Sequence, residues 1–242
     1  YITRHKVKKS ICSIMAKKFK GGHVMDEQKC CVSNFFKRLS GKAESRCTKI
    51  IDVAHRLFLD RGYENVSMND IVKESGGSLA TVYKHFGNKS QLLIKVLEHK
   101  SEELFGDWAR QRSNYEGRLE AFLMMIGASY LDLVADNDAI LFNRLIATLG
   151  YLEETRSVNQ TLLDVMMHPV NVIAEYLENE KQNGRICVED TTLCAHQFLN
   201  ALEEPFMFPR ILGVETDISE ATRHKALTQL VQIFCRGLCV SQ

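Results

Sequence analysis

Residues 67–89 restrict the fold of this chain more than any other stretch, because they read as two short helices joined by a tight glycine turn. Ser67 can cap the first helix by accepting a hydrogen bond from one of its first backbone N–H groups. Gly76 and Gly77 can end that helix, since glycine adopts the left-handed backbone that a sharp turn needs. Ser78 can cap the second helix. The spacing therefore predicts a helix-turn-helix.

The second of these helices has only one apolar face. By helical spacing its residues divide into inward Val82 and Phe86, outward Thr81, Lys84 and His85, and Tyr83 near the edge. Small, hydroxyl, aromatic and cationic side chains thus replace a second apolar face. This pattern favours a helix that lies in the major groove of DNA.

Helical periodicity extends over most of the chain, which predicts an all-α protein. Apolar residues recur at helical spacing, and the sequence has only 3 Pro and 14 Gly among its 242 residues. Beyond the helix-turn-helix, helices are expected near 89–112, 117–135, 138–150, 156–182, 190–210 and 217–239. Pro169 should interrupt the fourth of these, because proline removes a backbone donor. No apolar stretch is long enough to span a bilayer.

Several motifs in series give the stretch from Arg46 to Val96 a family resemblance. They are Ile50-Ile51-Asp52-Val53-Ala54-His55-Arg56-Leu57-Phe58, Gly62-Tyr63, Val66-Ser67-Met68-Asn69-Asp70-Ile71-Val72, Ser75-Gly76, Thr81-Val82-Tyr83-Lys84-His85-Phe86, Lys89 and Leu92-Leu93. Together they resemble the DNA-binding domain of TetR-type (TetR/AcrR) bacterial regulators. Two residues depart from the family pattern: Gly77 stands at a usually apolar position, and Ala80 at one that is often glycine.

The resemblance implies roles at the matching positions. It predicts phosphate contacts from Ser67, Thr81, Tyr83, His85 and Lys89, and places Ser78, Leu79, Ala80 and Lys84 closest to the bases. Phosphate contacts supply salt-sensitive affinity, whereas base contacts supply specificity. The alternative for Tyr83 and His85 is that they are ordinary surface or half-buried residues.

Charge is distributed unevenly along the chain. Residues 1–46 carry a net charge of +9, residues 47–100 carry +2, and residues 101–242 carry −10. A basic N-terminal part and an acidic C-terminal part suit a protein that presents one end to DNA. Residues 1–44 are interpreted as a basic, flexible extension; Met25 is a candidate native start, which would make residues 1–24 non-native. A solvated tail without a specific role is favoured over a DNA-tracking arm.

Metal, cofactor and catalytic chemistry find no support in the motifs. The eight cysteines include no Cys-x-x-Cys pair, so buried free thiols are favoured over a zinc site; a thiol-sensing regulator is the alternative. There is no phosphate-binding glycine loop and no nucleophile elbow. His168 and His196 have no spaced partner that would make a site. The sequence therefore predicts a protein that is not an enzyme and needs no cofactor.

The C-terminal part is predicted to sense a ligand and to form a dimer. In TetR-like proteins the last two long helices pair with their copies, which here implies helices 190–210 and 217–239. The helical spacing leaves a set of residues that could be either core or interface: Leu193, Phe198, Leu202, Leu227, Leu230, Val231 and Phe234. A dimer with two-fold symmetry reads a pseudo-palindromic operator, with its two DNA-binding domains about 34–36 Å apart or a multiple of that.

Large apolar side chains of the middle helices are the candidates for an effector pocket. They are Phe105, Trp108, Phe122, Met125, Tyr130, Phe142, Tyr151 and Met166. Methionine and aromatic side chains adapt to varied apolar ligands, although such a stripe is more often plain core. The acidic region favours an apolar or aromatic effector over a phosphorylated one, and a cationic apolar compound would also fit.

The sequence therefore predicts a ligand-responsive, homodimeric DNA-binding regulator of the bacterial cytoplasm, most simply a repressor that a small effector releases from its operator. The expected division is a helix-turn-helix domain over residues 45–94 and an effector-binding and dimerisation domain over residues 95–242. The alternative is a helical small-molecule- or partner-binding protein of the same fold that no longer binds an operator. Only Gly77 and Ala80 favour that alternative.

Overall fold

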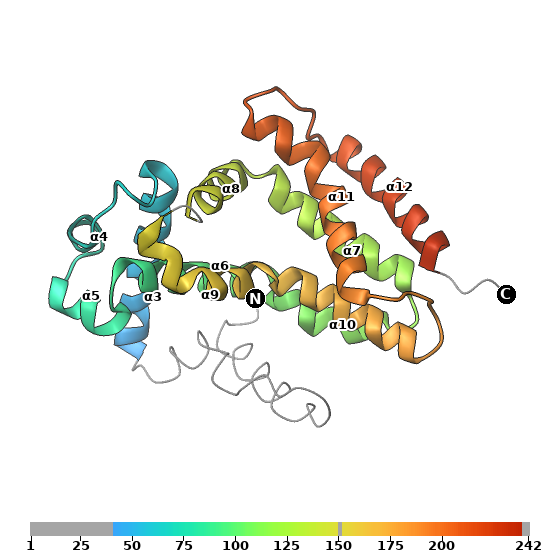
Figure 1. Cartoon of the computed structure of the whole chain (residues 1–242), viewed down its shortest axis with the longest axis horizontal. Helices are drawn as coiled ribbons and strands as arrows, with labels where there is room; N and C mark the ends of the chain where they lie inside the picture. Colours follow the sequence, from blue (N-terminus) through green and yellow to red (C-terminus); the bar gives the residue numbers. More distant parts are fainter. Residues whose placement is uncertain (1–40, 150–151, 239–242) are drawn as a thin grey trace.

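The computed structural model describes residues 41–149 and 152–238, and these residues confirm the all-α fold (Figure 1). They form ten α-helices and two short 3-10 segments, and no strand occurs among them. The α-helices are α3 (Gly41–Arg61), α4 (Met68–Ser75), α5 (Leu79–Phe86), α6 (Lys89–Gln111), α7 (Leu119–Ala135), α8 (Asn137–Leu149), α9 (Asn159–Met166), α10 (His168–Gln182), α11 (Thr191–Ile211) and α12 (Glu220–Leu238). The 3-10 segments are η2 (Arg112–Tyr115) and η3 (Glu153–Val158).

The predicted interruption of the fourth helix occurs at Met167. The stretch expected as one helix over 156–182 divides into α9 and α10, and Pro169 lies in the first turn of α10. Proline is tolerated there because the first N–H groups of a helix have no intrahelical acceptor to lose. The prediction for Pro169 is thus confirmed, with the break placed two residues before the proline.

Helices α4 and α5 lie at one end of the molecule, and α11 and α12 lie at the other (Figure 1). The buried apolar side chains form two clusters rather than one. The first cluster holds α3, α4, α5 and the start of α6 together, and it also includes Leu145, Leu149 and Leu162 from α8 and α9. The core that holds the helix-turn-helix therefore also includes later parts of the chain, which pack against α3 and α6.

The second cluster joins α7, α10, α11 and α12 around fully buried aromatic side chains. The ring of Phe122 stacks on that of Tyr176 with centroids 3.7 Å apart, and Phe198 meets Phe234 edge-on at 5.2 Å. Helix α6 reaches this cluster through Trp108, which is 3 % exposed. One helix therefore contributes to both cores.

The structure divides the residues that the sequence left as either core or interface. Phe198, Leu202, Leu227 and Val231 are buried, whereas Leu193 is 54 % exposed. Leu230 and Phe234 are partly buried against the second cluster. Four of the seven candidates are thus core residues of the single chain, and Leu193 remains available to a partner.

Some sequence-based predictions fall on residues that the structure does not describe. They concern residues 1–40 of the basic extension with the candidate start at Met25, four of the eight cysteines (Cys12, Cys30, Cys31 and Cys239) and Tyr151. Within the part of the chain that is described, no helix is both long and apolar enough to cross a lipid bilayer.

Candidate DNA-binding and effector sites

Helix α4 begins with a reciprocal cap that confirms the predicted role of Ser67. The Oγ of Ser67 accepts a hydrogen bond from the backbone N–H of Asp70 at 3.2 Å. In return the carboxylate of Asp70 accepts one from the backbone N–H of Ser67 at 2.9 Å and one from its hydroxyl at 2.6 Å. The hydrogen bond from the Ser67 hydroxyl is the main cause of a lowered pKa of the Asp70 carboxyl, and the one from the Ser67 backbone adds to it. The cap fixes where α4 begins.

Helix α5 begins after its predicted cap, Ser78, and ends before Gly87. Its N-cap is Ser78, whose Oγ accepts from the backbone N–H of Thr81 at 3.2 Å and lies 2.8 Å from the Thr81 hydroxyl. At the other end the N–H of Gly87 donates to the carbonyl of Tyr83 at 2.8 Å. These hydrogen bonds set both ends of the helix.

The faces of α5 are those that its spacing predicts. Val82 and Phe86 are 1 % and 3 % exposed, so they attach the helix to the first core. Tyr83 is 48 % exposed, which is more open than the edge position expected for it. The other predicted DNA contacts of this helix are Ala80 and Lys84, which are exposed, and Leu79, Thr81 and His85, which are partly exposed.

Lys89 has partners inside the protein that the motif did not predict. Its Nζ donates to the carbonyl oxygen of Tyr63 at 3.2 Å and lies 4.2 Å from the centroid of the Tyr63 ring. The cation–π contact and the hydrogen bond hold the ammonium at the junction between the turn after α3 and the start of α6. Its predicted phosphate contact would therefore come from a positioned side chain.

An ion-pair cluster ties α3 to α4, and sequence reasoning missed it. Arg56 and Arg61 of α3 both donate to the carboxylate of Glu74 on α4, the second at 3.0 Å. The hydrogen bond from Arg56 is the main cause of a lowered pKa of the Glu74 carboxyl. The two arginines lie 18 and 13 positions before Glu74, a separation that helical periodicity does not reveal.

Comparison with known proteins agrees with this geometry in both halves of the chain. Residues 50–96 match the model of the family described as bacterial regulatory proteins, tetR family. Residues 121–237 match that of the C-terminal domain of AefR-like transcriptional repressors. The HTH-type transcriptional regulator QacR of Staphylococcus aureus is 25% identical over 190 residues, which cover 78% of this chain and 96% of that protein.

Solved structures share the fold. A TetR-family regulator described as putative, from Mesorhizobium loti, superposes with a TM-score of 0.68 at 20% identity, over 84% of this chain and 100% of the other. The flavonoid-responsive regulator FrrA gives a TM-score of 0.67 at 21% identity, over 82% and 99% of the two chains.

The chain belongs to the TetR family. It is accordingly a ligand-responsive DNA-binding transcriptional regulator. Proteins of this family bind operator DNA and small-molecule effectors and act as dimers. Its named relatives are transcriptional regulators.

In this TetR-family chain, three of the predicted effector residues come together where α6 meets α7. The ring of Trp108 lies 4.9 Å from that of Phe105 and 6.3 Å from that of Tyr130, both edge-on. The indole Nε1 of Trp108 donates to the Ser129 hydroxyl at 3.1 Å. The indole is thus held in one orientation by an aromatic neighbour on each side and by a hydrogen bond.

Partly buried polar groups lie beside this aromatic cluster of Phe105, Trp108 and Tyr130. The Tyr130 hydroxyl donates to the carboxylate of Glu203 on α11, and burial, followed by that carboxylate, raises the pKa of the phenol. On the other side, Nδ1 of His168 lies 3.0 Å from the Ser101 hydroxyl, and burial lowers the pKa of its imidazole. His168 is therefore a hydrogen-bonded histidine of the interior.

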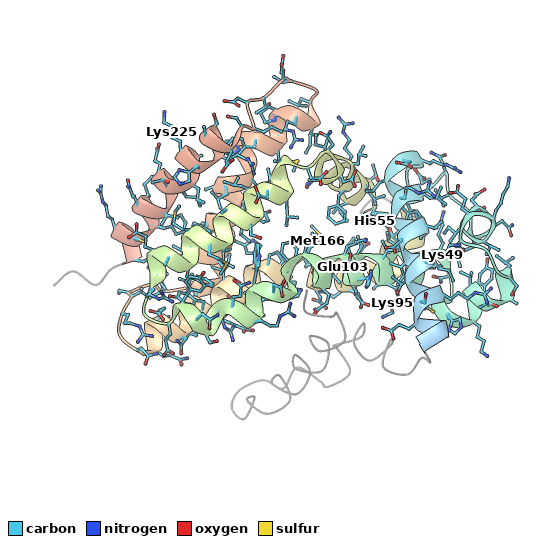
Figure 2. All side chains as sticks on the ribbon, turned by 180° about the vertical axis from the view of Figure 1, so that it is seen from behind. Lys49, His55, Lys95, Glu103, Met166 and Lys225 are labelled. Atoms are coloured by element: carbon cyan, nitrogen blue, oxygen red, sulfur yellow. The ribbon has the colours of Figure 1, made fainter. Side chains whose placement is uncertain are left out.

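The remaining effector candidates lie elsewhere. Phe122 is fully buried against Tyr176, and Met125 is partly buried in the second core. Phe142 packs against the first core instead. Met166 ends α9 and is 36 % exposed; Figure 2 shows it between the two ends of the molecule. The structure therefore brings only some of the candidates to one place.

A surface groove of about 440 Å³ runs between α8 and α11. It is lined by Asn143, Asn200, Glu203, Glu204, Met207, Phe208 and Ile211. Because Glu203 also accepts the hydrogen bond of Tyr130, this carboxylate connects the groove with the aromatic cluster.

The cysteines agree in part with the interpretation as buried thiols. Cys47 and Cys194 are buried, and burial raises the pKa of both thiols. Cys187 is exposed, so the interpretation is wrong for that residue, which lies between α10 and α11. No group of three or more His, Cys, Asp or Glu in the described ranges could hold a metal ion.

Proposed function

We propose that this TetR-family regulator is a homodimeric repressor that binds a pseudo-palindromic operator through α5 and leaves it when an apolar or aromatic effector binds between α6 and α7. The observation that carries the proposal is the exposed face of α5. Tyr83 and Lys84 point away from a helix whose other face is anchored by Val82 and Phe86.

The proposed DNA contacts divide by distance from the start of α5. Residues at its N-terminal end lie where recognition helices meet base edges; these are Ser78, Leu79 and Ala80, with Lys84 one turn on. The phosphate contacts are assigned to Ser67, Thr81, Tyr83, His85 and Lys89. Because Ser67, Ser78 and Thr81 hold hydrogen bonds at the helix ends, their contacts with DNA also depend on intact caps.

Helix α6 supports a mechanical link between the two sites. It begins at Lys89, beside the DNA-binding helices, and reaches the aromatic cluster at Phe105 and Trp108. Its 23 residues span roughly 35 Å. A ligand that moves the end at Trp108 would tilt the start of the helix, and with it the anchor of Lys89 on Tyr63. The ligand must prefer one of the two positions, or it shifts nothing.

Exposed apolar side chains on α11 and α12 support a dimer through these two helices. Leu193 and Phe208 of α11 are 54 % and 55 % exposed, and Ile233 of α12 is 58 % exposed. Side chains of this size on neighbouring helices suit a helical interface. The dimer would set the distance between the two copies of α5.

The effector class rests on the lining of the aromatic cluster. Its rings offer apolar and aromatic surface, and the half-buried carboxylate of Glu203 is an anion that would disfavour a phosphate. The fold neighbour named as flavonoid-responsive is an example of this fold in a regulator that responds to an aromatic compound.

Fluorescence anisotropy with a labelled duplex from the gene's own upstream region, against a scrambled duplex, tests the DNA-binding part. We expect tight binding to the native duplex only, weakened by salt. Tyr83→Ala and Lys89→Ala should lose roughly ten-fold or more in affinity while the dimer remains intact by light scattering. Lys225→Ala is the matched control, because it removes one charge from α12, far from α5 (Figure 2).

Equal and weak binding of the wild type to both duplexes would favour the alternative, a ligand-binding protein of the same fold that has lost its operator. Unchanged binding by Tyr83→Ala and Lys89→Ala would remove the assignment of those two residues.

The effector site has a built-in probe, since Trp108 is the single tryptophan of the chain. Apolar and aromatic compounds that bind the cluster should change Trp108 fluorescence and release the protein from DNA at matching concentrations. Tyr130→Phe should alter the affinity for such a compound, because it removes the hydrogen bond to Glu203. Phe142→Leu, in the other core, should not. Release from DNA without any change in emission would place the effector elsewhere.

A further inference from the structure

The turn between α4 and α5 is occupied by a side chain from α3. Gly77 has a φ of +107°, and a Cβ built on it would meet the guanidinium of Arg46, at 3.1 Å from Cζ and 3.3 Å from Nε, with Nη2 closer still. The same construction at Gly76, whose φ is +80°, meets nothing within 4 Å. Arg46 therefore lies directly against the backbone of Gly77, and a residue with a side chain at this position would displace it.

This contact explains one of the two departures from the family pattern. An apolar side chain, usual at the position of Gly77, would fill the space that the guanidinium takes here. Because Gly77 comes directly before Ser78, the N-cap of α5, the cation of Arg46 lies beside the end of α5 that is expected to meet base edges.

Arg46 differs from the other arginines of α3. Arg56 and Arg61 are both engaged by Glu74, whereas Arg46 is exposed and forms no ion pair with any carboxylate among the described residues. A guanidinium keeps its charge at all physiological pH values and offers five N–H donors. Its position against a glycine also reduces the side-chain entropy that binding would cost.

We propose that Arg46 is a further DNA contact, which binds a backbone phosphate next to the base pairs that α5 reads. The proposal rests on the proposed function. A phosphate is the expected partner because Arg46 belongs to α3, outside the helix that enters the groove, and flanking elements contact the backbone. Arg46 also belongs to the basic part of the sequence, since residues 1–46 carry a net charge of +9.

Salt-dependent anisotropy on the native and scrambled duplexes tests this contact. Arg46→Ala should weaken binding to both duplexes by a similar factor, roughly ten-fold at low salt, and reduce the slope of log K against log salt by about 1. Arg46→Lys should keep most of the slope, because it keeps the charge. Lys225→Ala, which removes the same charge from the far end of the molecule, should change neither quantity (Figure 2).

A pair of glycine variants tests the part played by the turn. Gly77→Ala and Gly76→Ala strain a left-handed backbone alike, but only the first displaces Arg46. We expect the larger loss of affinity for Gly77→Ala, and no further change in salt slope when it is combined with Arg46→Ala. Circular dichroism establishes that each variant is folded before binding is measured.

Two results would overturn the proposal. The first is a salt slope for Arg46→Ala equal to that of Lys225→Ala. The second is a loss of affinity for the native duplex alone with the salt slope unchanged, which would mean a base contact. Failure of the proposed function is distinguishable, because it would show in the wild type as equal binding to both duplexes.

Discussion

The two regions of this molecule differ in how several of their helices begin. In the DNA-binding region, α4, α5 and α6 each begin at a residue whose side chain accepts a hydrogen bond from the backbone three positions on: Ser67, Ser78 and Asn88. In the effector region, α7, α9 and α10 follow Arg118, Val158 and Met167, none of which makes such a bond. Local hydrogen bonds thus define the first region but not these three helices of the second.

In the effector region, contacts between residues far apart in the sequence hold the ends of α7. The guanidinium of Arg210 on α11 donates to the carbonyls of Val134, Ala135 and Asp136, which end α7. The buried carboxylate of Glu180 on α10 accepts from the backbone N–H of Gly117, just before α7, at 3.1 Å. The ends of α7 are therefore closed by side chains 63 to 76 positions away.

This difference suits the two functions. The DNA-binding region must keep one geometry, and caps formed by neighbouring residues fix where its helices begin. A switching region must have two packings close in free energy, and long-range contacts can be exchanged between them.

Arg210→Met should have the largest effect, because it leaves the last carbonyls of α7, including the buried one of Val134, without their donor. We expect a loss of about 3 kcal/mol in the free energy of unfolding, measured by urea denaturation. Arg236→Met, at an exposed position of α12, is the control and should cost little. A loss for Arg210→Met no larger than that of the control would mean that the ends of α7 do not need this long-range contact.

Ser67→Ala should have an intermediate effect and act on the other region. Loss of the N-cap of α4 should cost about 1 kcal/mol, seen as faster amide hydrogen exchange in α4 and weaker operator binding, with little change in α7. Ser113→Ala, at an exposed position of η2, provides the comparison. Equal changes in exchange across α4 and α7 would break the distinction between the two regions.

The smallest effect should be a dependence of stability on acid pH that comes from Glu180. Burial by itself raises the pKa of this carboxyl, but the hydrogen bonds from Arg185 and from Gly117 outweigh it, and the net pKa is lowered. The folded protein thus binds the proton less readily than the unfolded chain. The stabilisation is present above the unfolded pKa of about 4.3 and is lost as pH falls through the folded value.

Thermal unfolding between pH 7 and pH 3 would measure this contribution. Glu180→Gln should be less stable than the wild type at neutral pH and should approach it at the acid end. Glu215→Gln, at an exposed position, is the control and should follow the wild-type profile. A constant difference between Glu180→Gln and the wild type at every pH would show that the charge of Glu180 contributes nothing.

The sequence by itself determined the all-α class, the two capped helices around the glycine turn, the inward faces of Val82 and Phe86, and the break near Pro169. These features follow from residues within a few positions of each other, and such spacing is visible in a linear chain. For the same reason the family resemblance was strongest over residues 46–96. The boundary at residues 94–95 and the individual DNA contacts stay predictions.

Only the tertiary structure decided which distant side chains meet. Helical spacing could not separate the buried Phe198 from the exposed Leu193, nor show that Phe142 belongs to a different core from Trp108. It also gave no sign that Arg46 lies on Gly77, 31 positions further along the chain. Periodicity states that a side chain lies on an apolar or a polar face, but the partner of that face depends on how whole helices pack, and this is a property of the folded chain alone.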